Sequence, residues 1–554
     1  MKSRWYKDAV VYQIYPRSFC DSNGDGIGDL NGITSKIPYL KALGINAVWL
    51  SPCYASPNDD NGYDISDYRA IMPEFGTMED WERMTATLHE NGIRLIMDLV
   101  VNHTSDEHRW FQESKKGKDN PYSDYYIWRD GTGADKRTPP NNWRACFGGS
   151  VWEYCEERGQ FYLHLFSKKQ PDLNWDNPQV RKEVADICNF WLEKGVDGFR
   201  CDVITYISKP ENLYGAKSSS FVVGPNWKKY IRSLAEASWD RFDTLIVGEA
   251  TGINFDRAAE ITDERDHLLD TLFHFEHVSQ VPVCSYSQRS TNLRRFKRTL
   301  FRWQQLPEAC WPAVYYENHD QPRSLPRFAP AGALWERSAK SLAVSLLFQR
   351  GTAFIYQGQE LGMTNAPFRE KDYRDIQAVN QIKAARSRPF AWLEMPFLLR
   401  YLSRYSRDHA RTPMQLEDSP NAGFTTGEPW LMVNPNYPQI NAAEQDKRTD
   451  SVLDFYRRAL RLRSEQINLV REGTFVPVDP KNKKVVAYAR HLGDGTLLVL
   501  CSLSPQKSVA RIPAEYLAGK ARLILGNLNR APELRERTVL EPCQCAVFLL
   551  GETH

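Results

Sequence analysis

Long hydrophobic runs are missing from this sequence of 554 residues. No stretch reaches the roughly 18 apolar residues that a membrane-spanning helix needs, so we do not expect a membrane protein. The first residues, MKSRWYKDAVVYQIY, show neither an apolar core nor a small-residue cleavage site, so no secretory signal is visible. Internal repeats and low-complexity tracts are absent as well. The length exceeds what one ordinary core accommodates and predicts roughly two or three domains.

An excess of either charge is also missing. The 71 Lys and Arg balance 69 Asp and Glu for a formal net charge of +2. This balance gives no hint of nucleic acid or an anionic membrane as a partner. A disulfide framework is not indicated, because the 11 cysteines are scattered and odd in number. We interpret them as reduced thiols that pack as small apolar residues, and we predict a cytoplasmic protein.

What the sequence does contain is a series of short hydrophobic runs, each followed by a helical pattern. Nearly continuous runs of this kind are typical of parallel strands covered on both faces. Eight strand–helix units match the count of a (β/α)8 TIM barrel, an α/β fold. The eight runs are Val10–Tyr15, Ala47–Leu50, Leu95–Val101, Gly198–Ile204, Leu245–Glu249, Thr271–Glu276, Val314–Asn318 and Ala353–Tyr356.

Two segments depart from this even spacing. Residues 104–172, between the third and fourth runs, are rich in Gly, Pro, Asn and Trp, and are too long for a plain loop. Beyond about Val485 the pattern changes to strands without long helices, which indicates a small β domain, a sandwich. We therefore predict a catalytic barrel over 1–103 and 173–480, an inserted subdomain over 104–172, and a C-terminal β domain over 481–554.

Polar residues gather where the predicted barrel strands end. In this fold the C-terminal ends of the strands carry the catalytic residues. Burying one carboxylate there is costly without a partner, and burying four is hard to explain as stabilisation. The residues in question are Asp98, Asn102, His103, Arg200, Asp202, Glu249, His319 and Asp320.

These residue types suit the cleavage of a glycosidic bond with retention. That reaction needs two carboxyls about 5 Å apart, one a nucleophile and the other an acid that then acts as a base. Arg200 lies two residues before Asp202 on the same face of its strand, and can hold that carboxyl ionised, as a nucleophile requires. Glu249, on the adjacent strand, is the natural partner.

The blocks DLVVNH (98–103), GFRCDV (198–203), VGEA (247–250) and ENHD (317–320) resemble the four signature regions of the α-amylase superfamily, glycoside hydrolase family 13. The blocks YQIYPRSF, DSNGDGIGDL, NGYDISDY, QPDLNW and RTPMQ resemble its oligo-1,6-glucosidase and α-glucosidase branch. The resemblance implies Asp202 as nucleophile, Glu249 as acid/base and Asp320 as a carboxylate that stabilises the transition state. It implies a retaining, exo-acting α-glucosidase for short saccharides, with no organic cofactor, as a monomer or small homo-oligomer.

The resemblance also implies a pocket for the terminal glucose, with Asp98 holding its hydrogen-bond network. Asp64 and Arg411 would close this pocket and so favour exo-action over an endo-acting amylase. Val203, directly after the nucleophile, resembles enzymes that prefer α-1,6 over α-1,4 bonds. The residues implied to line the pocket are Tyr63, Asp64, His103, Phe166, Arg200, His319 and Arg411.

The loop from Asp21 to Asp29 begins like an EF-hand loop. Its twelfth position is Gly32 instead of the bidentate Glu that an EF-hand needs, so it is not an EF-hand. A hard-cation site and a metal-free polar turn both remain open from the residues alone. The resemblance implies structural Ca2+ (or Mg2+) on residues matching Asp21, Asn23, Asp25 and Asp29 and the carbonyl of Ile27.

Several positions near the leaving group depart from the family pattern. Glu249 is followed by Ala-Thr-Gly, Leu416 replaces a Trp, Glu417 replaces an Asp, and the stretch 210–224 is unusual. Sucrose hydrolysis, trehalose 6-phosphate hydrolysis and sucrose isomerisation therefore stay open, although the segment from Arg323 to Phe328 resembles the hydrolases. A non-catalytic binding subunit would have lost the catalytic carboxylates and gained a membrane span, and this chain shows neither change.

Overall fold

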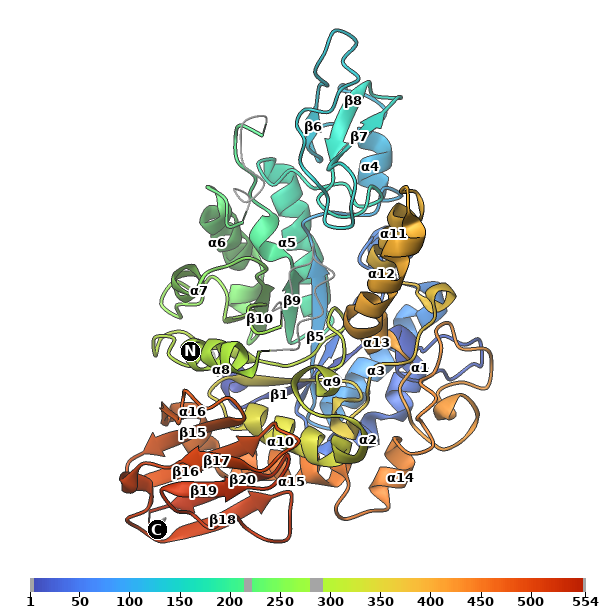
Figure 1. Cartoon of the computed structure of the whole chain (residues 1–554). Coiled ribbons are helices and arrows are strands. Elements are labelled where there is room, and N and C mark those ends of the chain that lie inside the picture. The colour runs from blue at the N-terminus through green and yellow to red at the C-terminus, as the bar shows by residue number, and fades with distance from the viewer. Residues whose placement is uncertain (1–3, 214–221, 279–291, 552–554) are drawn as a thin grey trace.

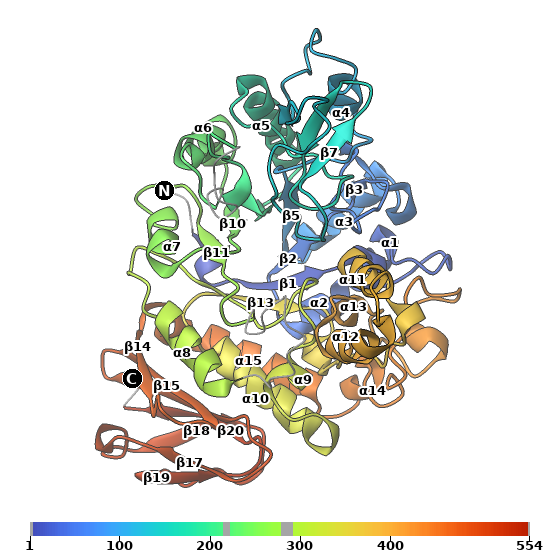
Figure 2. The ribbon, with the colours of Figure 1, turned by 45° about the horizontal axis from the view of Figure 1, so that its top comes forward.

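The computed structural model describes residues 4–213, 222–278 and 292–551, and eight parallel strands form its centre (Figures 1 and 2). The strand order is β11-β10-β9-β5-β2-β1-β13-β12, and almost every residue in these strands is buried. This confirms the predicted barrel, whose strands read as hydrophobic runs because both faces are covered. The strands are β1 (Val10–Ile14), β2 (Ala47–Leu50), β5 (Arg94–Val100), β9 (Gly198–Asp202), β10 (Leu245–Glu249), β11 (Thr271–Phe273), β12 (Ala313–Val314) and β13 (Thr352–Tyr356).

Side chains close the barrel between β11 and β12, the two ends of the strand order. The Phe273 and Tyr315 rings pack edge to face with centroids 5.0 Å apart. The Tyr315 hydroxyl donates to the carbonyl of His274 at 2.7 Å, and His277 Nε2 lies 2.7 Å from the carbonyl of Tyr315. These contacts join the two edges where the backbone ladder does not.

The helices surround the barrel with their apolar stripes inward. In α3 (Met78–Glu90), Thr77 and Asp80 form a capping box, and Trp81, Met84 and Leu88 are buried at helical spacing. The other helices of this layer are α1 (Leu30–Ser35), α2 (Ile37–Leu43), α5 (Pro178–Glu193), α6 (Trp227–Ala237), α7 (Phe255–Ile261), α8 (Leu293–Trp303), α9 (Leu325–Phe328), α10 (Trp335–Leu347), α15 (Val452–Glu465) and α16 (Ile467–Glu472). Within the described part of the chain, no helix combines the length and apolar character needed to cross a membrane.

Insertions stand on the C-terminal side of the barrel. Residues 104–172 contain α4 (Arg109–Ser114) and a small sheet of β6 (Trp128–Arg129), β8 (Gln160–Leu163) and β7 (Trp152–Cys155), which Figure 1 shows at the top of the molecule. After β13, α11 (Ile376–Arg386) and α12 (Ala391–Tyr405) lie side by side in both views, followed by α13 (Asp408–Arg411) and α14 (Ala442–Asp446). Two short strands, β3 (Tyr54–Ala55) and β4 (Asp67–Ile71), flank the second barrel loop.

The C-terminal unit is an antiparallel sheet in the order β14-β15-β16-β20-β18, accompanied by the pair β17-β19. Alternate residues enter two cores: Val486 and Tyr488 face the barrel, whereas Val485 and Ala487 face the β17-β19 pair. Because β14 pairs with β15, it already belongs to this unit. The unit therefore begins before the expected boundary at 481. The strands are β14 (Thr474–Val478), β15 (Val485–Leu492), β16 (Gly495–Ser502), β17 (Ser508–Arg511), β18 (Ala521–Gly526), β19 (Arg537–Leu540) and β20 (Cys545–Leu550).

A buried lysine joins this unit to the barrel. Lys297 on α8 is fully buried, and its ammonium donates to the carbonyls of Asp479, Asn482 and Val485 at 2.7–3.0 Å.

We expect Lys297→Met to lower the free energy of unfolding by roughly 2–4 kcal/mol, because three buried carbonyls lose their donor. Thermal and urea unfolding measure the change. Arg294→Met, an exposed change on the same helix, is the control, and equal stability of the two variants would contradict the role of Lys297.

Candidate active site

Arg200 binds three carboxylates at the mouth of the barrel. Its Nη1 donates to Asp98 at 2.6 Å and to Asp202 at 2.7 Å, and its Nη2 is hydrogen-bonded to Glu249. Strand register explains the arrangement, since Asp98 on β5 and Val247 on β10 both lie opposite Arg200 on β9. The structure therefore brings together four of the residues that the sequence singled out.

One guanidinium cannot neutralise three carboxylates, so this group retains a proton more readily than isolated carboxyls do. Burial raises the pKa of Asp98 to about 6, although Arg200 opposes the shift. Burial also raises the pKa of Asp202, again against Arg200, while the charge of Glu249 adds to the rise. A retaining glycosidase needs such a shared proton, because one carboxyl must be an acid while its neighbour is ionised.

Asp320 lies in a second, more positive environment. Arg407 and Arg411 donate to the same oxygen at 3.0 and 3.1 Å, and His319 Nε2 lies 3.2 Å from the other oxygen. Despite burial, the charges of Arg407 and Arg411 hold the pKa of Asp320 well below its usual range. Burial lowers the pKa of His319 to about 3, so its imidazole is neutral. Asp320 is therefore a fixed anion.

Aromatic and imidazole rings form the wall between these two groups. The Tyr63 ring stacks on His319 with centroids 5.1 Å apart, and its hydroxyl donates to Asp98 at 3.1 Å. His103 lies against Phe166, with centroids 5.3 Å apart, and burial lowers the pKa of His103 to about 4. Its Nε2 lies 3.1 Å from the carbonyl of Tyr63. The wall is thus uncharged and can pack on the faces of a sugar ring.

Asp64 does not lie as the sequence led us to expect. Its carboxylate is fully buried and accepts from the backbone N–H groups of Asp59 and Asp60 at 2.8 and 3.0 Å. The carboxylate that faces Arg407 is Asp60, at 3.5 Å. Asp64 therefore shapes its own loop, and Asp60 takes the place opposite the arginines.

Sequence reasoning also missed Arg407 and Asp375. Asp375 caps α11 and accepts from Arg407 at 2.6 Å and from Arg411 at 3.0 Å. The four-residue spacing of the two arginines, which brings side chains to one face of a helix, was the available signal. Asp375 gave none, because its role depends on a helix that returns to the site.

Val203 has an unusual backbone. Its φ of 35° is in the left-handed region, which is a genuine outlier for a β-branched residue. Its N–H lies 3.3 Å from Glu249 and can donate to it. The strained turn therefore directs a backbone donor at the second carboxyl, and its buried side chain packs with Tyr206 and Phe166.

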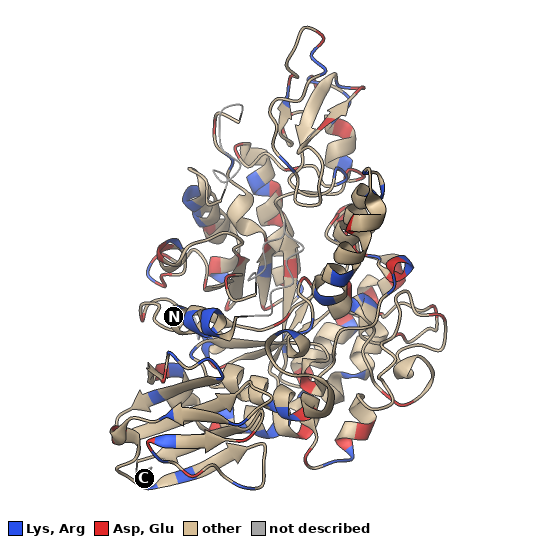
Figure 3. Ribbon diagram, viewed as in Figure 1, with Lys and Arg blue, Asp and Glu red and all other residues tan. Residues whose placement is uncertain are grey.

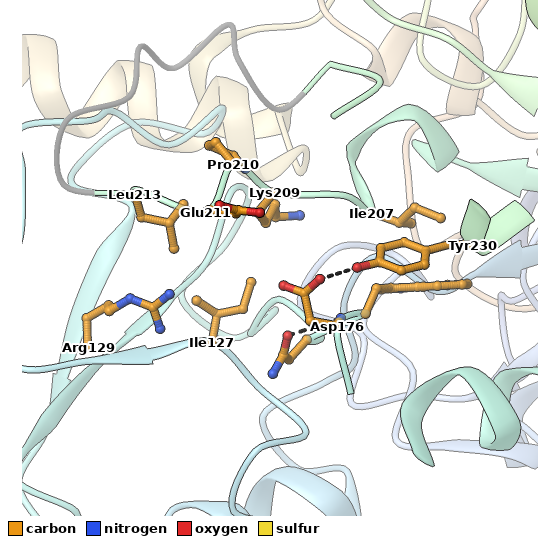
Figure 4. Close-up of a pocket in the computed structure, with 11 residues that line it drawn as sticks. Ile127, Arg129, Asp176, Ile207, Lys209, Pro210, Glu211, Leu213 and Tyr230 are labelled. Carbon is orange, nitrogen blue, oxygen red and sulfur yellow. Dashed lines mark hydrogen bonds between the residues drawn. The ribbon is translucent and has the colours of Figure 1, made fainter. Parts of the chain in front are cut away.

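A separate cavity of about 130 Å³ lies beside the site, between the inserted subdomain and the barrel (Figure 4). Lys209 borders it and is buried, donating to Asn102 at 2.8 Å and pairing with Asp172 at 2.8 Å. Figure 4 shows Asp176 hydrogen-bonded to Tyr230 on its far side. Asp172 also accepts from the N–H of Leu165, next to Phe166. Through Asp172, Lys209 therefore stabilises the loop that carries Phe166.

The Asp21–Asp29 loop is ordered by its own hydrogen bonds. Asp21 accepts from the N–H groups of Gly24 and Gly26 at 2.7 and 2.8 Å, while Asn23 and Asp25 accept two residues further on. Asp29 caps α1 through the N–H of Gly32. Among the described residues, no group of three or more His, Cys, Asp or Glu side chains is arranged to hold a metal ion. The oxygens of Asp21, Asn23, Asp25 and Asp29 still suit a hard cation, and Asp29 accepts from Ser22 in the loop as well as from the helix.

Two carboxyls that share a guanidinium at the C-terminal mouth of a (β/α)8 barrel meet the requirement of a glycoside hydrolase. The family model for the catalytic domain of alpha amylase matches residues 13–473, and the chain belongs to this family. It is 45% identical to oligo-1,6-glucosidase of Bacillus cereus over 99% of this chain and 100% of that protein. It is 46% identical to oligo-1,6-glucosidase of Parageobacillus thermoglucosidasius, with 99% of each covered. The crystal structure of Bacillus licheniformis trehalose-6-phosphate hydrolase superposes with a TM-score of 0.91, at 38% identity, covering 99% of this chain and all of that one.

The positions of Asp60 and Asp64 predict different effects of substitution. Asp60→Asn removes the charge that faces Arg407, so we expect kcat/KM for a short α-glucoside to fall by about two orders of magnitude, as for a lost charged contact. Asp64→Asn keeps an acceptor for the loop and should change kcat/KM less than about tenfold. A larger loss for Asp64→Asn than for Asp60→Asn would restore the original expectation.

Asp60 also predicts a pH effect on stability. Burial raises its pKa to about 7 against Arg407 and Arg411, so the folded state binds a proton that the unfolded state has lost. This contribution is complete below about pH 4 and is lost as the pH rises toward 7, by at most about 1.4 kcal/mol per pH unit. Melting temperatures from pH 5 to 7.5 should therefore show a smaller fall for Asp60→Asn than for the wild type.

Proposed function

We propose that the protein is a retaining, exo-acting α-glucosidase that hydrolyses terminal α-glucosidic bonds of short saccharides. The observation that carries this proposal is the attachment of Asp202 and Glu249 to the two ends of one guanidinium. This keeps the carboxyls neighbours, as the separation of about 5 Å in retaining enzymes requires. The identity to oligo-1,6-glucosidases over the whole chain supports the same reaction.

In the first step, the Asp202 carboxylate attacks the anomeric carbon while Glu249 gives its proton to the glycosidic oxygen, which leaves as an alcohol. A glucosyl ester of Asp202 remains. In the second step, Glu249, now ionised, takes a proton from water, and the water oxygen attacks the anomeric carbon and frees Asp202. Asp320 is ionised throughout and stabilises the positive charge that develops on the sugar ring.

Exo-action is supported by the buried charges that surround the glucose site. Asp60, Asp320, Arg407 and Arg411 are linked by hydrogen bonds and ion pairs on one side, and Tyr63 and His319 form the wall. A sugar hydroxyl that fails to reach such groups leaves them unpaired, which discriminates strongly against the wrong sugar. An ionic ring of this kind closes the pocket beyond one terminal residue.

Substitutions of Asp202 and Glu249 should have different kinetic effects. We expect Asp202→Asn to lose several orders of magnitude in kcat while the fold survives, since no ester can form. Glu249→Gln should still release the alcohol from an activated aryl α-glucoside, whose leaving group needs no proton, in a burst that ends when the glucosyl ester has formed, and it should lose activity on disaccharides. Mass spectrometry of Glu249→Gln with a 2-fluoroglucosyl donor should find the sugar on Asp202, and labelling of any other residue would contradict the assignment.

We propose a preference for α-1,6 over α-1,4 bonds, supported by Val203. Its buried, stiff side chain offers an apolar wall and no hydroxyl, which suits the C6 methylene of an α-1,6-linked leaving sugar. One such group discriminates by about 1–3 kcal/mol, or roughly 10- to 200-fold. We therefore expect a higher kcat/KM on isomaltose than on maltose. Val203→Thr should reduce the ratio of the kcat/KM for isomaltose to that for maltose. Val203→Ala is the control for lost volume, and a wild type that prefers maltose would contradict the proposal.

A phosphorylated leaving sugar is a second candidate substrate. A cavity of about 500 Å³ is lined by Thr251, two residues beyond Glu249, and by Arg295, Arg298 and Arg302 of α8, a helix rich in basic residues (Figure 3). Glu276 pairs with Arg302, which leaves the lining basic overall, and arginine is well suited to a phosphate group. Comparing trehalose 6-phosphate with trehalose and isomaltose tests this candidate, and equal kcat/KM for the first two would exclude it.

We propose that a structural Ca2+ (or Mg2+) binds Asp21, Asn23, Asp25 and Asp29 and the carbonyl of Ile27. Two observations support this site. Oxygen side chains lie at three alternate positions of the loop. The pKa of Asp21 is lowered, because hydrogen bonds from Thr425 and the backbone outweigh the effect of burial. The ion would bind the folded state and raise its melting temperature. Prolonged chelation should lower the melting temperature of the wild type but not of Asp21→Asn/Asp25→Asn, and an unchanged wild type without metal by mass analysis would contradict it.

We also propose a cytoplasmic location, supported by the cysteines. All ten cysteines in the described part of the chain are free thiols, and eight of them are buried. Such a set suits a reducing compartment.

A further inference from the structure

The tip of the α11–α12 hairpin exposes an unusual apolar surface, which we call the apolar tip. Phe390, Trp392, Leu393 and Phe397 are 70%, 71%, 51% and 58% exposed. Elsewhere in residues 4–213, 222–278 and 292–551, the exposed large hydrophobic side chains are confined to the C-terminal β unit, at Leu492, Val509 and Val539. An isolated apolar residue on a surface is ordinary, but four within eight positions form a patch that calls for a partner.

The apolar tip is not the face that packs the hairpin together. Leu398 and Leu402 of α12 are buried with Ile382 and Ala385 of α11 in one core. The helix has therefore already buried an apolar stripe, and Leu393 and Phe397 lie on its opposite face, with Trp392 and Phe390 beside them at its start. A surface helix that needs only its own domain has one such stripe.

The turn that presents the tip is held by specific contacts. Phe390 has a φ of 65°, which is rare for an aromatic residue, and it accepts from the N–H of Leu393 through its carbonyl. Arg388 pairs with Glu394 at 2.8 Å across the turn. These contacts fix the apolar tip as a preformed surface.

The charged neighbours of the tip are arranged along the helix. Arg388 is paired with Glu394, and Arg386 with Glu370 at 2.5 Å, so the basic groups at the turn have acidic partners. Arg400 and Arg404 are exposed at the other end of α12, beyond the apolar stretch. The outer face of α12 is therefore apolar in its first half and basic in its second.

We propose that the apolar tip is the interface through which two copies of this chain form a two-fold dimer, with α12 packed antiparallel to its counterpart. In this pairing Leu393 of each copy meets Phe397 of the other, and Arg400 of each copy lies over the exposed ring of Phe390 of the other, as in a cation–π contact. The basic ends of the two helices point away from each other. A two-fold arrangement is the commonest form of self-association.

The size of the tip fits a second copy. With aromatic side chains of 150–250 Å², the four exposed residues present roughly 500 Å² of apolar surface per copy. Two copies thus contribute roughly 1,000 Å², the lower bound for a specific interface. An anionic bilayer could also bury the apolar side chains. It offers no reason, however, for the apolar and basic residues of α12 to lie in separate halves of the helix.

The proposed dimer also bears on the active site. Both ends of the hairpin are fastened there, since Asp375 precedes α11 and Arg407 and Arg411 follow α12, and Asp375 pairs with both arginines. Burying the tip would restrain the hairpin at its free end. The dimer proposal does not depend on the substrate, so its failure leaves the proposed hydrolysis intact.

Light scattering after size exclusion, and sedimentation velocity over a wide concentration range, test the proposal on the full chain. We expect the wild type to approach twice the chain mass of 63.9 kDa. Trp392→Ser/Phe397→Ser should run at the mass of one chain, with an unchanged circular dichroism spectrum. Leu492→Ser/Val539→Ser removes comparable exposed side chains from the C-terminal β unit and should remain dimeric.

Each other outcome overturns the proposal. A wild type of one-chain mass at all concentrations excludes the dimer, and a dimeric Trp392→Ser/Phe397→Ser variant places the interface elsewhere. If Arg400→Glu leaves the dimer dissociation constant unchanged, the antiparallel pairing is wrong, whereas we expect at least a tenfold weakening. Flotation of a monomeric wild type with vesicles containing phosphatidylglycerol, lost in Trp392→Ser/Phe397→Ser, would assign the tip to a membrane instead.

Discussion

The bonds between Arg200 and the three carboxylates of Asp98, Asp202 and Glu249 are the constraint on which the site depends. Four charges leave water at the mouth of the barrel, and such burial is tolerated only when the groups pair with one another. The parallel register of β5, β9 and β10 supplies that pairing without help from a loop. Because the cation is outnumbered, the group holds a proton that the reaction requires. The excess of carboxylates over guanidinium groups thus lowers the stability of the fold and also supplies the proton for the reaction.

A second ionic group complements the first. Asp60, Asp320 and Asp375 surround Arg407 and Arg411, so here carboxylates and guanidinium groups are more evenly matched. The two groups differ in electrostatic character: one retains a proton, and the other keeps Asp320 ionised. Their separation follows from the fold, since strands carry the first and segments after β13 carry most of the second. A hairpin that leaves the barrel and returns thus becomes part of the sugar pocket.

The sequence predicted what depends on strands and missed what depends on loops. Each of the eight runs overlaps one barrel strand, because period and length identify buried parallel strands, although the seventh run, 314–318, shares only Val314 with β12. Asp98, Arg200, Asp202 and Glu249 could be grouped because strand ends meet at one edge. Sequence reasoning named Asp64 and missed Asp60, since only the turn between them decides which carboxylate points inward. Arg407 and Asp375 were missed for a similar reason: their partners lie far along the chain, and no local period reports such contacts.

The same distinction bears on specificity. The candidate active site is fixed by hydrogen bonds between protein groups, such as Tyr63 on Asp98 and Arg411 on Asp320, so its shape does not depend on a bound ligand. Val203, beside Glu249, is held in an apolar cluster with Tyr206. A packed apolar wall tolerates substitution better than a paired charge does. The charged centre is therefore set by the barrel strands, whereas the apolar residues beside it can change at a lower cost in stability.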